Sequence, residues 1–316
     1  MSDYSREFEA IVRAYEQSGG DASALLDRRF ASLVVSGNRV LASNSIPGVR
    51  IEGEETETGA RARVTVEPGT QVALPVHLCF GVTPQEGLQE IIPEFEIGEG
   101  AKVRFLAHCS FPNAVNVRHL MDAKVHVGRG AKVEYSETHF HGREGGVEVV
   151  PKTEVKVEAG GAFRNQFRLV TGRVGRLDLD LNAYLEERAI CDLEVKVHGR
   201  KDDEIRVKES VYLNGAGCRG LVKSRIVVTE RAQSEVLGEI VGNAPYTRGH
   251  VDCMEIVQGD RATAKAVPLL QVFHPTAKLT HEAAIGSLDK KQVQTLMARG
   301  LSEDEAVDVV VRGLLK

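Results

Sequence analysis

The residues with the clearest chemical potential lie near the end of the chain. Residues 279–286 read LTHEAAIG and place His281 directly beside Glu282. Cys253, within GHVDCMEIV, stands 28 residues before His281, and His250 precedes this cysteine by three residues. A thiolate, an imidazole and a carboxylate are ligands for iron or zinc, and the same groups could form a nucleophile with its base and an orienting group. The residue types alone leave both chemistries open.

Other candidate groups carry less information. His139 and His141, in THFHG, alternate on one predicted strand face and could bind a metal, but no carboxylate or thiol is indicated close to them. Cys79 and Cys109 lie 30 residues apart in apolar strand contexts and could stack on one another. Because a free cysteine often fills space in a core, structural packing is the favoured interpretation for this pair.

Cys253 and the His281–Glu282 pair are distant in the sequence, and a fold built of repeated units would bring them close together. One phrase recurs with its first residues 31, 30 and 30 positions apart, as VEPGTQV (66–72), IGEGAKV (97–103), VGRGAKV (127–133) and VEAGGAF (157–163). The phrase then decays, but short alternating strand ends persist at a slightly shorter spacing, as AYL (183–185) and VYL (211–213). Self-similarity at such a period is typical of a solenoid or a propeller.

The pattern within each unit decides the fold class. Apolar residues alternate with a period of two, which indicates strands rather than helices. The sequence therefore predicts a mainly β fold, a right-handed parallel β-helix over residues 56–286 with about eight coils of about thirty residues. A propeller would need longer units of four strands, and a β-sandwich with regular hairpins is the remaining alternative.

Helical segments are expected at both ends of the β-helix. Residues 1–55 are predicted to form an N-terminal helical segment and a lead-in, and residues 287–316 a C-terminal helical segment. The last predicted helix starts with a capping box, because Ser302 is followed three residues later by Glu305. These C-terminal helices are expected to cover the open last coil, a partner, or both, and covering the last coil is the simplest interpretation.

Stacking of successive coils is expected to bring Cys253 close to His281 and Glu282. Residues one period apart in a solenoid become neighbours about 5 Å apart. Taken as the step between coils, the spacing of the later repeats places His281 beside Cys253 and Glu282 beside Met254. The sequence thus predicts a cluster of Cys253, His281 and Glu282. Basic side chains about one coil earlier could edge this cluster or form a solvated strand face: Arg219, Lys223 and Arg225.

Composition excludes several classes of protein. The net charge of −5 and 27% charged residues give no reason to expect nucleic acid. No apolar run is long enough for a membrane span, and the charged N-terminus lacks an apolar signal core. Five scattered cysteines without a CxxC motif favour free thiols in the cytoplasm. The phosphate-binding motifs GxxxxGK[ST] and GxGxxG with its flanking elements are missing, so no nucleotide is expected on this chain.

The end of the chain resembles a known family. The order of cysteine, QGD, VP, HP, HEA, IG and RGLSEDEA from residue 249 onward is similar to the C-terminal signature of the SufB/SufD family of iron-sulfur cluster assembly proteins. The resemblance extends from about residue 35 to the end. It implies a β-helix core, pairing through that core as a dimer, and C-terminal helices that bind the ABC-type ATPase SufC.

The resemblance also implies roles for individual residues. By position, Cys253 matches the family's cluster-associated cysteine, and His281 and Glu282 match its His-Glu pair. SufD-like members keep the histidine but lose the other two, so all three together imply a SufB-like scaffold. Such a scaffold holds a transient iron-sulfur cluster and passes it to recipient apo-proteins. Thr280 stands where SufB-type proteins often have an acidic residue, so a contribution from this position stays open, as it does for His250.

Two other functions remain open. One is a SufD-like adaptor that binds the ATPase without holding a cluster, and the other is an enzyme built on a β-helix, such as a carbohydrate lyase or an acyltransferase. The enzyme would need a groove with several carboxylates or a catalytic histidine, and no hexapeptide acyltransferase repeat is visible. The favoured prediction is a non-enzymatic scaffold that forms a homodimer, with ATPase activity in the partner.

Overall fold

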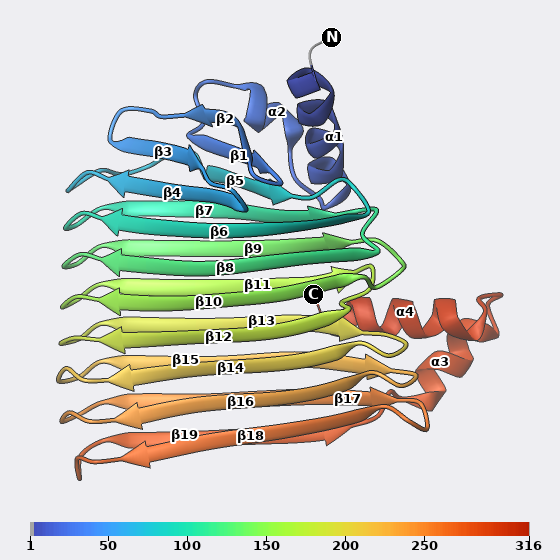
Figure 1. Ribbon diagram of the computed structural model, residues 1–316. Coiled ribbons are helices and arrows are strands. Elements are labelled where there is room, and N and C mark those ends of the chain that lie inside the picture. Colours follow the sequence, from blue (N-terminus) through green and yellow to red (C-terminus); the bar gives the residue numbers. More distant parts are fainter. Residues whose placement is uncertain (1–2, 316) are drawn as a thin grey trace.

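The computed structural model describes residues 3–315, and these form a β-solenoid of about eight turns with helices at both ends (Figure 1). The predicted mainly β solenoid is confirmed. Ten strands form one sheet: β1 (Ser32–Ser36), β2 (Arg39–Asn44), β5 (Val76–Gly81), β7 (Lys102–Phe111), β9 (Lys132–His141), β11 (Ala162–Thr171), β13 (Ile190–Gly199), β15 (Arg219–Thr229), β17 (Arg248–Gln258) and β19 (Lys278–Gly286).

Nine strands form the facing sheet: β3 (Val49–Glu55), β4 (Gly59–Val66), β6 (Glu86–Ile97), β8 (Asn116–Val127), β10 (Val147–Val157), β12 (Arg176–Leu185), β14 (Glu204–Leu213), β16 (Gln233–Gly242) and β18 (Thr263–Val272). The helices are α1 (Asp3–Gln17), α2 (Ala22–Leu26), α3 (Lys290–Met297) and α4 (Glu303–Leu314). Each turn of the solenoid contributes one strand to each sheet, and from β4 and β5 onward every strand pairs in parallel with the strand one turn away.

The solenoid begins earlier than the sequence predicts. Strands β1 to β3 lie within residues 32–55, where a lead-in was expected. β1 pairs with β2 and β3 pairs with β4 in antiparallel hairpins, and β1 also pairs with β5 in parallel. A hairpin on each sheet therefore closes the first turn, which leaves no full repeat in this region for a periodicity argument to find.

One column of turns explains the repeated glycines. Each phrase ends the strand of the nine-stranded sheet with a glycine at positive φ, seen at Gly69, Gly100, Gly130 and Gly160 with φ between 65° and 72°. Later turns keep this conformation at Arg188 (φ 55°), Gly217 (φ 69°) and Tyr246 (φ 60°). The left-handed conformation favours glycine but does not require it. The repeated motif becomes less recognisable in the later turns because residues other than glycine adopt the same turn conformation.

Strand alternation fills the space between the two sheets. Along β8 every second side chain is buried, and the core consists mainly of Val, Ala, Leu and Ile. Some of the few aromatic rings meet edge to face, as Phe95 does with Phe105 at a centroid distance of 5.2 Å. An interior this narrow is filled by small side chains, consistent with the 5% aromatic content.

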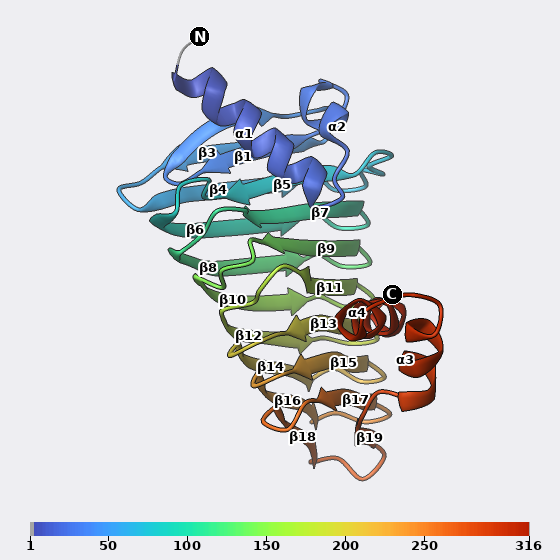
Figure 2. The same ribbon diagram turned by 90° about the vertical axis from the view of Figure 1, so that its right-hand side faces the viewer.

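The helices pack on the outer face of the ten-stranded sheet, α1 at the first turns of the solenoid and α3 and α4 over later turns between β11 and β17 (Figures 1 and 2). Helix α1 buries Ile11 and Tyr15 against the first turns, in a cluster that includes Cys79. Helices α3 and α4 bury apolar side chains against Val227 of β15 and Ile256 of β17. The simplest interpretation, that the C-terminal helices cover the open last coil, is therefore wrong.

The helix-start signal at the C-terminus is confirmed. Ser302 caps α4, its hydroxyl accepts the backbone N–H of Glu305, and the Glu305 carboxylate accepts the backbone N–H of Ser302. Gly300, with φ 98°, ends the preceding turn and lets the chain reverse between the helices. Among residues 3–315, no helix is both long and apolar enough to cross a bilayer.

A buried carboxyl group gives the fold a specific pH dependence. Glu209 on β14 points between the sheets, is 1% exposed, and both its carboxyl oxygens lack a hydrogen-bond partner within the described residues. Burial raises the pKa of Glu209 from 4.5 to about 8, and the charge of Glu194 adds to this shift. Between pH 4.5 and about 8, the carboxyl group of Glu209 is ionised in the unfolded chain and protonated in the folded chain. Stability should therefore fall with rising pH, by up to about 1.4 kcal/mol per pH unit.

Replacing this carboxyl group tests the effect. Glu209→Met should raise the melting temperature more at pH 8 than at pH 5, as thermal unfolding at both pH values would show. Glu204→Met, at an exposed position of the same strand, is the matched control and should show no such difference. Equal gains at both pH values would contradict a protonated Glu209 in the folded state.

Candidate functional site

The structure places the predicted site residues on neighbouring strands at the end of the solenoid. Cys253 lies on β17 and the His-Glu pair on β19, and these strands pair in parallel. In the register between them, Cys253 lies opposite Ala283 and His281 lies opposite Val251. The predicted step from Cys253 to His281 is therefore wrong by two positions, because the late turns are longer than the repeat from which that step was taken.

Strand alternation separates the three residues by face. Val251 and Cys253 are buried between the sheets, and His281 continues the column of Val251, so His281 starts on the same inner face as Cys253. The two are diagonal neighbours, with Cα atoms about 8 Å apart by ordinary strand geometry. Glu282 lies opposite Asp252 and starts on the outer face. The structure thus brings Cys253 and His281 together and directs Glu282 away from them.

Cys253 occupies a polar patch of the otherwise apolar interior. It is 1% exposed and lies opposite Ser224 of β15, whose hydroxyl is also buried. Glu255, two residues along β17, accepts a hydrogen bond from the Ser234 hydroxyl at 2.6 Å. Burial raises the pKa of the Cys253 thiol, while the Ser224 hydroxyl acts in the opposite direction. The isolated subunit therefore holds Cys253 as a protonated thiol.

A glycine on the facing sheet permits close packing next to Cys253. A methyl group built on Gly238 of β16 would lie 2.8 Å from Val251 and 3.7 Å from the sulfur of Cys253. Because 2.8 Å is too short for a contact between two carbon atoms, a larger residue at this position would displace Val251 beside the thiol.

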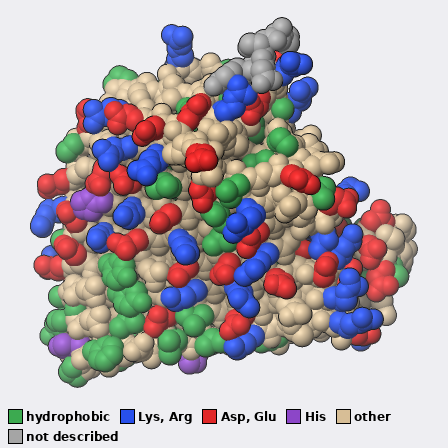
Figure 3. All heavy atoms as spheres, in the orientation of Figure 1, with side chains coloured by type: hydrophobic (Ala, Val, Ile, Leu, Met, Phe, Trp, Pro, Cys, Tyr) green, Lys and Arg blue, Asp and Glu red, His purple; other side chains and the backbone are tan. Residues whose placement is uncertain are grey.

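The last turn of the solenoid is open to solvent. His281 and Glu282 are exposed, as are most residues of β19, because β19 is an edge strand of its sheet within residues 3–315 and the C-terminal helices pack elsewhere. Apolar side chains gather at the lower left of Figure 3, over the last turns. The exposed large apolar residues of this end include Tyr246 (72%), Leu269 (38%), Val272 (52%), Phe273 (69%) and Ile285 (53%).

Of the two interpretations of the basic residues, the structure supports the solvated strand face on the outside of the sheet. Arg225 forms an ion pair with Asp252 at 2.5 Å, and Lys223 approaches Glu194 at 3.1 Å. His250 is also on this face, where its Nδ1 lies 2.8 Å from the hydroxyl of Thr280. These groups have partners on the outer face of the sheet, so they form a solvated strand face and do not contribute a positive charge to the interior around Cys253.

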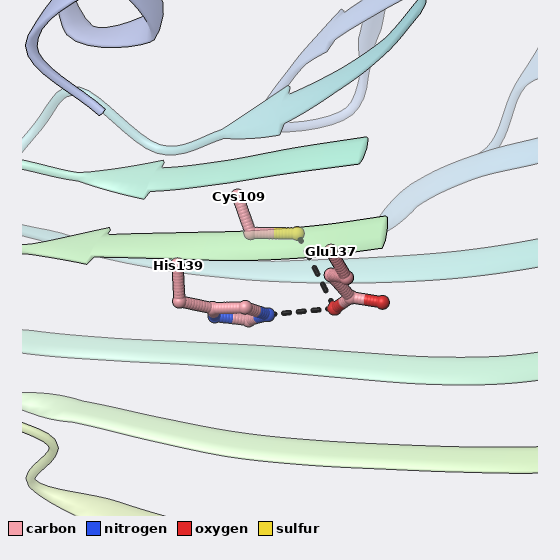
Figure 4. Close-up of side chains that lie close together, drawn as sticks. All are labelled: Cys109, Glu137 and His139. Atoms are coloured by element: carbon pink, nitrogen blue, oxygen red, sulfur yellow. Dashed lines mark hydrogen bonds and ion pairs between the residues drawn. The ribbon is translucent and has the colours of Figure 1, made fainter. Parts of the chain in front are cut away.

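A second group of potential ligands, inside the first half of the solenoid, was not predicted. Cys109, Glu137 and His139 lie together with one ligand atom of each within 4.8 Å of the others (Figure 4). The prediction that neither a carboxylate nor a thiol lies near His139 is therefore wrong. The signal was present in the sequence, because Cys109 precedes His139 by 30 residues, and Glu137 shares the alternation of His139.

The proposed stacking of Cys79 on Cys109 is also wrong. Cys79 lies opposite His108 in the register between β5 and β7, one residue out of step. It therefore faces outward and packs beneath α1, whereas Cys109 faces the interior. A shift of one residue moves a strand side chain to the opposite face.

Comparison with known proteins assigns the family. Residues 51–314 match the model described as "SUF system FeS cluster assembly, SufBD core domain". An iron-sulfur cluster assembly SufBD family protein of Pyrococcus horikoshii is 38% identical over 99% of this chain and 95% of its own length. A protein of the same description from Methanocaldococcus jannaschii is 34% identical over 98% of both chains. The solenoid, its flanking helices and these matches show that the chain belongs to the SufBD family of iron-sulfur cluster assembly proteins.

Proposed function

We propose that this protein is a scaffold on which a nascent iron-sulfur cluster is assembled, at a site containing Cys253, His281 and Glu282. The observation that carries the proposal is the placement of Cys253 and His281 on one inner face, a single turn from the open end of the solenoid. A cluster bound partly by non-cysteine ligands would be more labile than one bound by four cysteines, which suits transfer to recipient apo-proteins. Anaerobic loading with iron and sulfide tests this role.

The same proposal includes a homodimer through the open end of the solenoid. Strands β18 and β19 present unpaired backbone groups, and exposed apolar side chains surround them. An open sheet edge with apolar flanks is a surface that proteins usually cover. A second copy of the chain is the occupant we propose, because its own β18 and β19 offer a matching edge and apolar surface across a twofold axis. Dimer formation would bring a second Cys253 and His281 to the same interface.

The C-terminal helices are the proposed docking surface for a SufC-like ABC ATPase. They bury one side against the solenoid and leave Met297 (40%), Val309 (47%) and Leu314 (39%) exposed. Their contact with the solenoid includes Ile256, which is three residues beyond Cys253 on β17. A shift of α3 and α4 on ATP binding by the partner would thus act on the strand that carries the buried thiol.

The contact between α4 and the solenoid contains free volume that would allow α4 to shift. A cavity of about 1050 Å³ is lined both by α4 and by turns of the solenoid. Arg200 and Asp308 form an ion pair of 3.2 Å between these two parts, with the side chains 22% and 38% exposed. A partly exposed ion pair contributes little to stability, so this contact opposes such a shift only weakly.

Charge placed on the exposed helix surface should weaken ATPase binding. Val309→Asp is expected to reduce the affinity for a SufC-like ATPase about ten-fold or more, because a central apolar contact is replaced by a charge that must lose its water. Titration calorimetry with the purified ATPase would measure the change. Val115→Asp, at a similarly exposed apolar residue (52%) between β7 and β8, is the matched control. Equal affinities for both variants would contradict docking at these helices.

A second candidate function is a SufD-like adaptor that binds the ATPase and holds no cluster. Two observations favour it: Cys253 is 1% exposed, and Glu282 starts on the opposite face from His281. The adaptor predicts complex formation without iron uptake, even with the ATPase and its nucleotide present. We place either function in the cytoplasm, supported by the five free cysteines in the described part of the chain.

A further inference from the structure

The cluster in the first half of the solenoid is built as a ligand site. Cys109 projects inward from β7, and Glu137 and His139 project inward from β9. Their exposed fractions are 0%, 6% and 1%, so all three potential ligands are shielded from water. The Cys109 sulfur lies 3.8 Å from Glu137 Oε1, and His139 Nε2 lies 2.7 Å from the same oxygen. Sulfur, oxygen and nitrogen thus converge on one point.

A chain of hydrogen bonds fixes which atoms carry protons. His141 Nδ1 lies 2.9 Å from the backbone oxygen of Arg173, which can only accept, so this nitrogen donates. The other nitrogen of a neutral His141 then accepts from His139 Nδ1, at 3.4 Å. His139 Nε2 is therefore left with a lone pair directed at Glu137. With the site empty, the Glu137 carboxyl group must supply the proton between them.

The surroundings favour the neutral forms that this pattern requires. Burial raises the pKa of Glu137 from 4.5 to about 7 and lowers the pKa of His139 from 6.5 to about 3. Burial also raises the pKa of the Cys109 thiol well above 9.0. The rings of Phe111 and Phe167 pack beside His139, with centroids 6.2 and 4.8 Å away, and complete an apolar surround.

A fourth potential ligand lies on the facing sheet without a partner. His119 of β8 is 1% exposed, and neither of its ring nitrogens has a hydrogen-bond partner among residues 3–315. Its ring centroid is 6.0 Å from that of His139. A buried imidazole with both nitrogens unsatisfied is unfavourable unless something else binds it. This orphaned histidine is an observation independent of the three-residue cluster.

We propose that Cys109, Glu137, His139 and His119 bind one divalent metal ion of borderline softness, Fe²⁺ or Zn²⁺. One sulfur, one oxygen and two nitrogen ligands suit a tetrahedral centre of either ion. Metal–sulfur and metal–oxygen bonds of about 2.3 and 2.0 Å would place sulfur and oxygen about 3.5 Å apart, close to the spacing found here. The relay through His141 to the Arg173 carbonyl then orients His139 from behind, as such outer partners do in metal sites.

The charges balance when the ion binds. The Cys109 thiol and the Glu137 carboxyl group each release one proton to solvent, and the divalent ion replaces both. Thiolate, carboxylate and ion together carry no net charge, so the apolar interior does not hold an uncompensated charge. Affinity should therefore increase as pH rises, since fewer protons have to be displaced.

This site is separate from the proposed cluster site. The columns of the ten-stranded sheet align Glu137, Phe167, Val195, Ser224 and Cys253 in successive strands. Four strand spacings correspond to about 19 Å between the first and the last. A metal ion at Cys109 is thus out of reach of Cys253, and its binding does not depend on the proposed scaffold role.

Cobalt binding tests the proposal directly. The full chain carrying Cys253→Ser would be made metal-free and loaded with Co²⁺ anaerobically, both by titration and during refolding. We expect one equivalent of Co²⁺ with a thiolate-to-cobalt charge-transfer band and the visible bands of a four-coordinate site. Adding Cys109→Ser should abolish the charge-transfer band, and His139→Gln should weaken binding at least ten-fold. Competition with equimolar Fe²⁺ and Zn²⁺, followed by metal analysis, would identify the preferred ion.

Matched variants separate ligand loss from misfolding. Cys191→Ser, at another fully buried cysteine of the interior, should keep the full cobalt spectrum. Each variant's far-ultraviolet circular dichroism and melting temperature would establish that it folds, and Glu137→Gln supplies a near-isosteric second variant that should also lose affinity. A charge-transfer band that survives Cys109→Ser, or an absence of stoichiometric binding after both loading routes, would overturn the proposal.

Discussion

Cys253→Ser is expected to leave the protein colourless after anaerobic reconstitution with iron and sulfide, whereas the wild type becomes brown. The serine hydroxyl is a poor ligand for iron at neutral pH. In the described chain no second thiol lies near Cys253 at the open end of the solenoid. The other four cysteines lie in other turns or in the contact with α1. Loss of iron and labile sulfide should therefore be nearly complete. Iron, acid-labile sulfide and visible absorption would be measured with and without the ATPase partner.

Three further variants grade the contribution of each residue. His281→Ala should lose most of the cluster, because His281 shares the inner face with the thiol. Glu282→Gln should lose less, because its side chain starts on the outer face. Cys191→Ser, a buried interior cysteine two strands away in the sheet, should load as the wild type does. Equal loading of Cys253→Ser and Cys191→Ser would remove Cys253 from the site. A wild type that takes up no iron even with the ATPase present would favour the adaptor function.

Charges on the open end of the solenoid are expected to convert the homodimer into monomers. Phe273 and Ile285 are 69% and 53% exposed and flank the edge strands β18 and β19. At the centre of an interface, each would contribute about 1–2 kcal/mol or more, so Phe273→Asp with Ile285→Lys should weaken dimerisation about 100-fold. Sedimentation equilibrium over a range of concentrations would measure the shift.

The opposite end of the molecule offers the control for this experiment. Leu26 on α2 is 67% exposed, and Leu26→Lys introduces a charge of the same kind about a whole solenoid away. It should leave the dimer intact. A wild type that is monomeric at micromolar concentration, or a double variant that dimerises as tightly as Leu26→Lys, would contradict dimerisation through β18 and β19.

Much of the fold could be predicted because the turns of the solenoid require similar residues at regular intervals in the sequence. Gly100 and Gly130 stand one repeat apart since each occupies the same left-handed turn, and such a repeat with strand alternation indicates a solenoid. The sequence repeat becomes unrecognisable where Arg188 and Tyr246 adopt that turn in place of glycine. It is also absent from the antiparallel hairpins of residues 32–66. The side on which α3 and α4 pack depends on tertiary contacts with Val227 and Ile256, which no local pattern reveals.

The geometry of the candidate site could not be predicted from the sequence, and its membership stays a prediction. Residue types and family resemblance single out Cys253, His281 and Glu282, but a register error of two residues changes which side chains are neighbours. The interior cluster shows the same sensitivity. Cys109 and His139 meet because they are direct partners in the register of β7 and β9, and a shift of one residue, as between β5 and β7, would have turned Cys109 outward.

The central claim is that Cys253 and His281 hold a nascent cluster together. Pulsed electron paramagnetic resonance of the reduced, reconstituted protein labelled with ¹⁵N-histidine tests it most directly. The account predicts a directly coordinated histidine nitrogen in the wild type, whose coupling disappears from any cluster that still loads in His281→Gln. A loaded cluster without histidine coupling, or a coupling unchanged in His281→Gln, would contradict it.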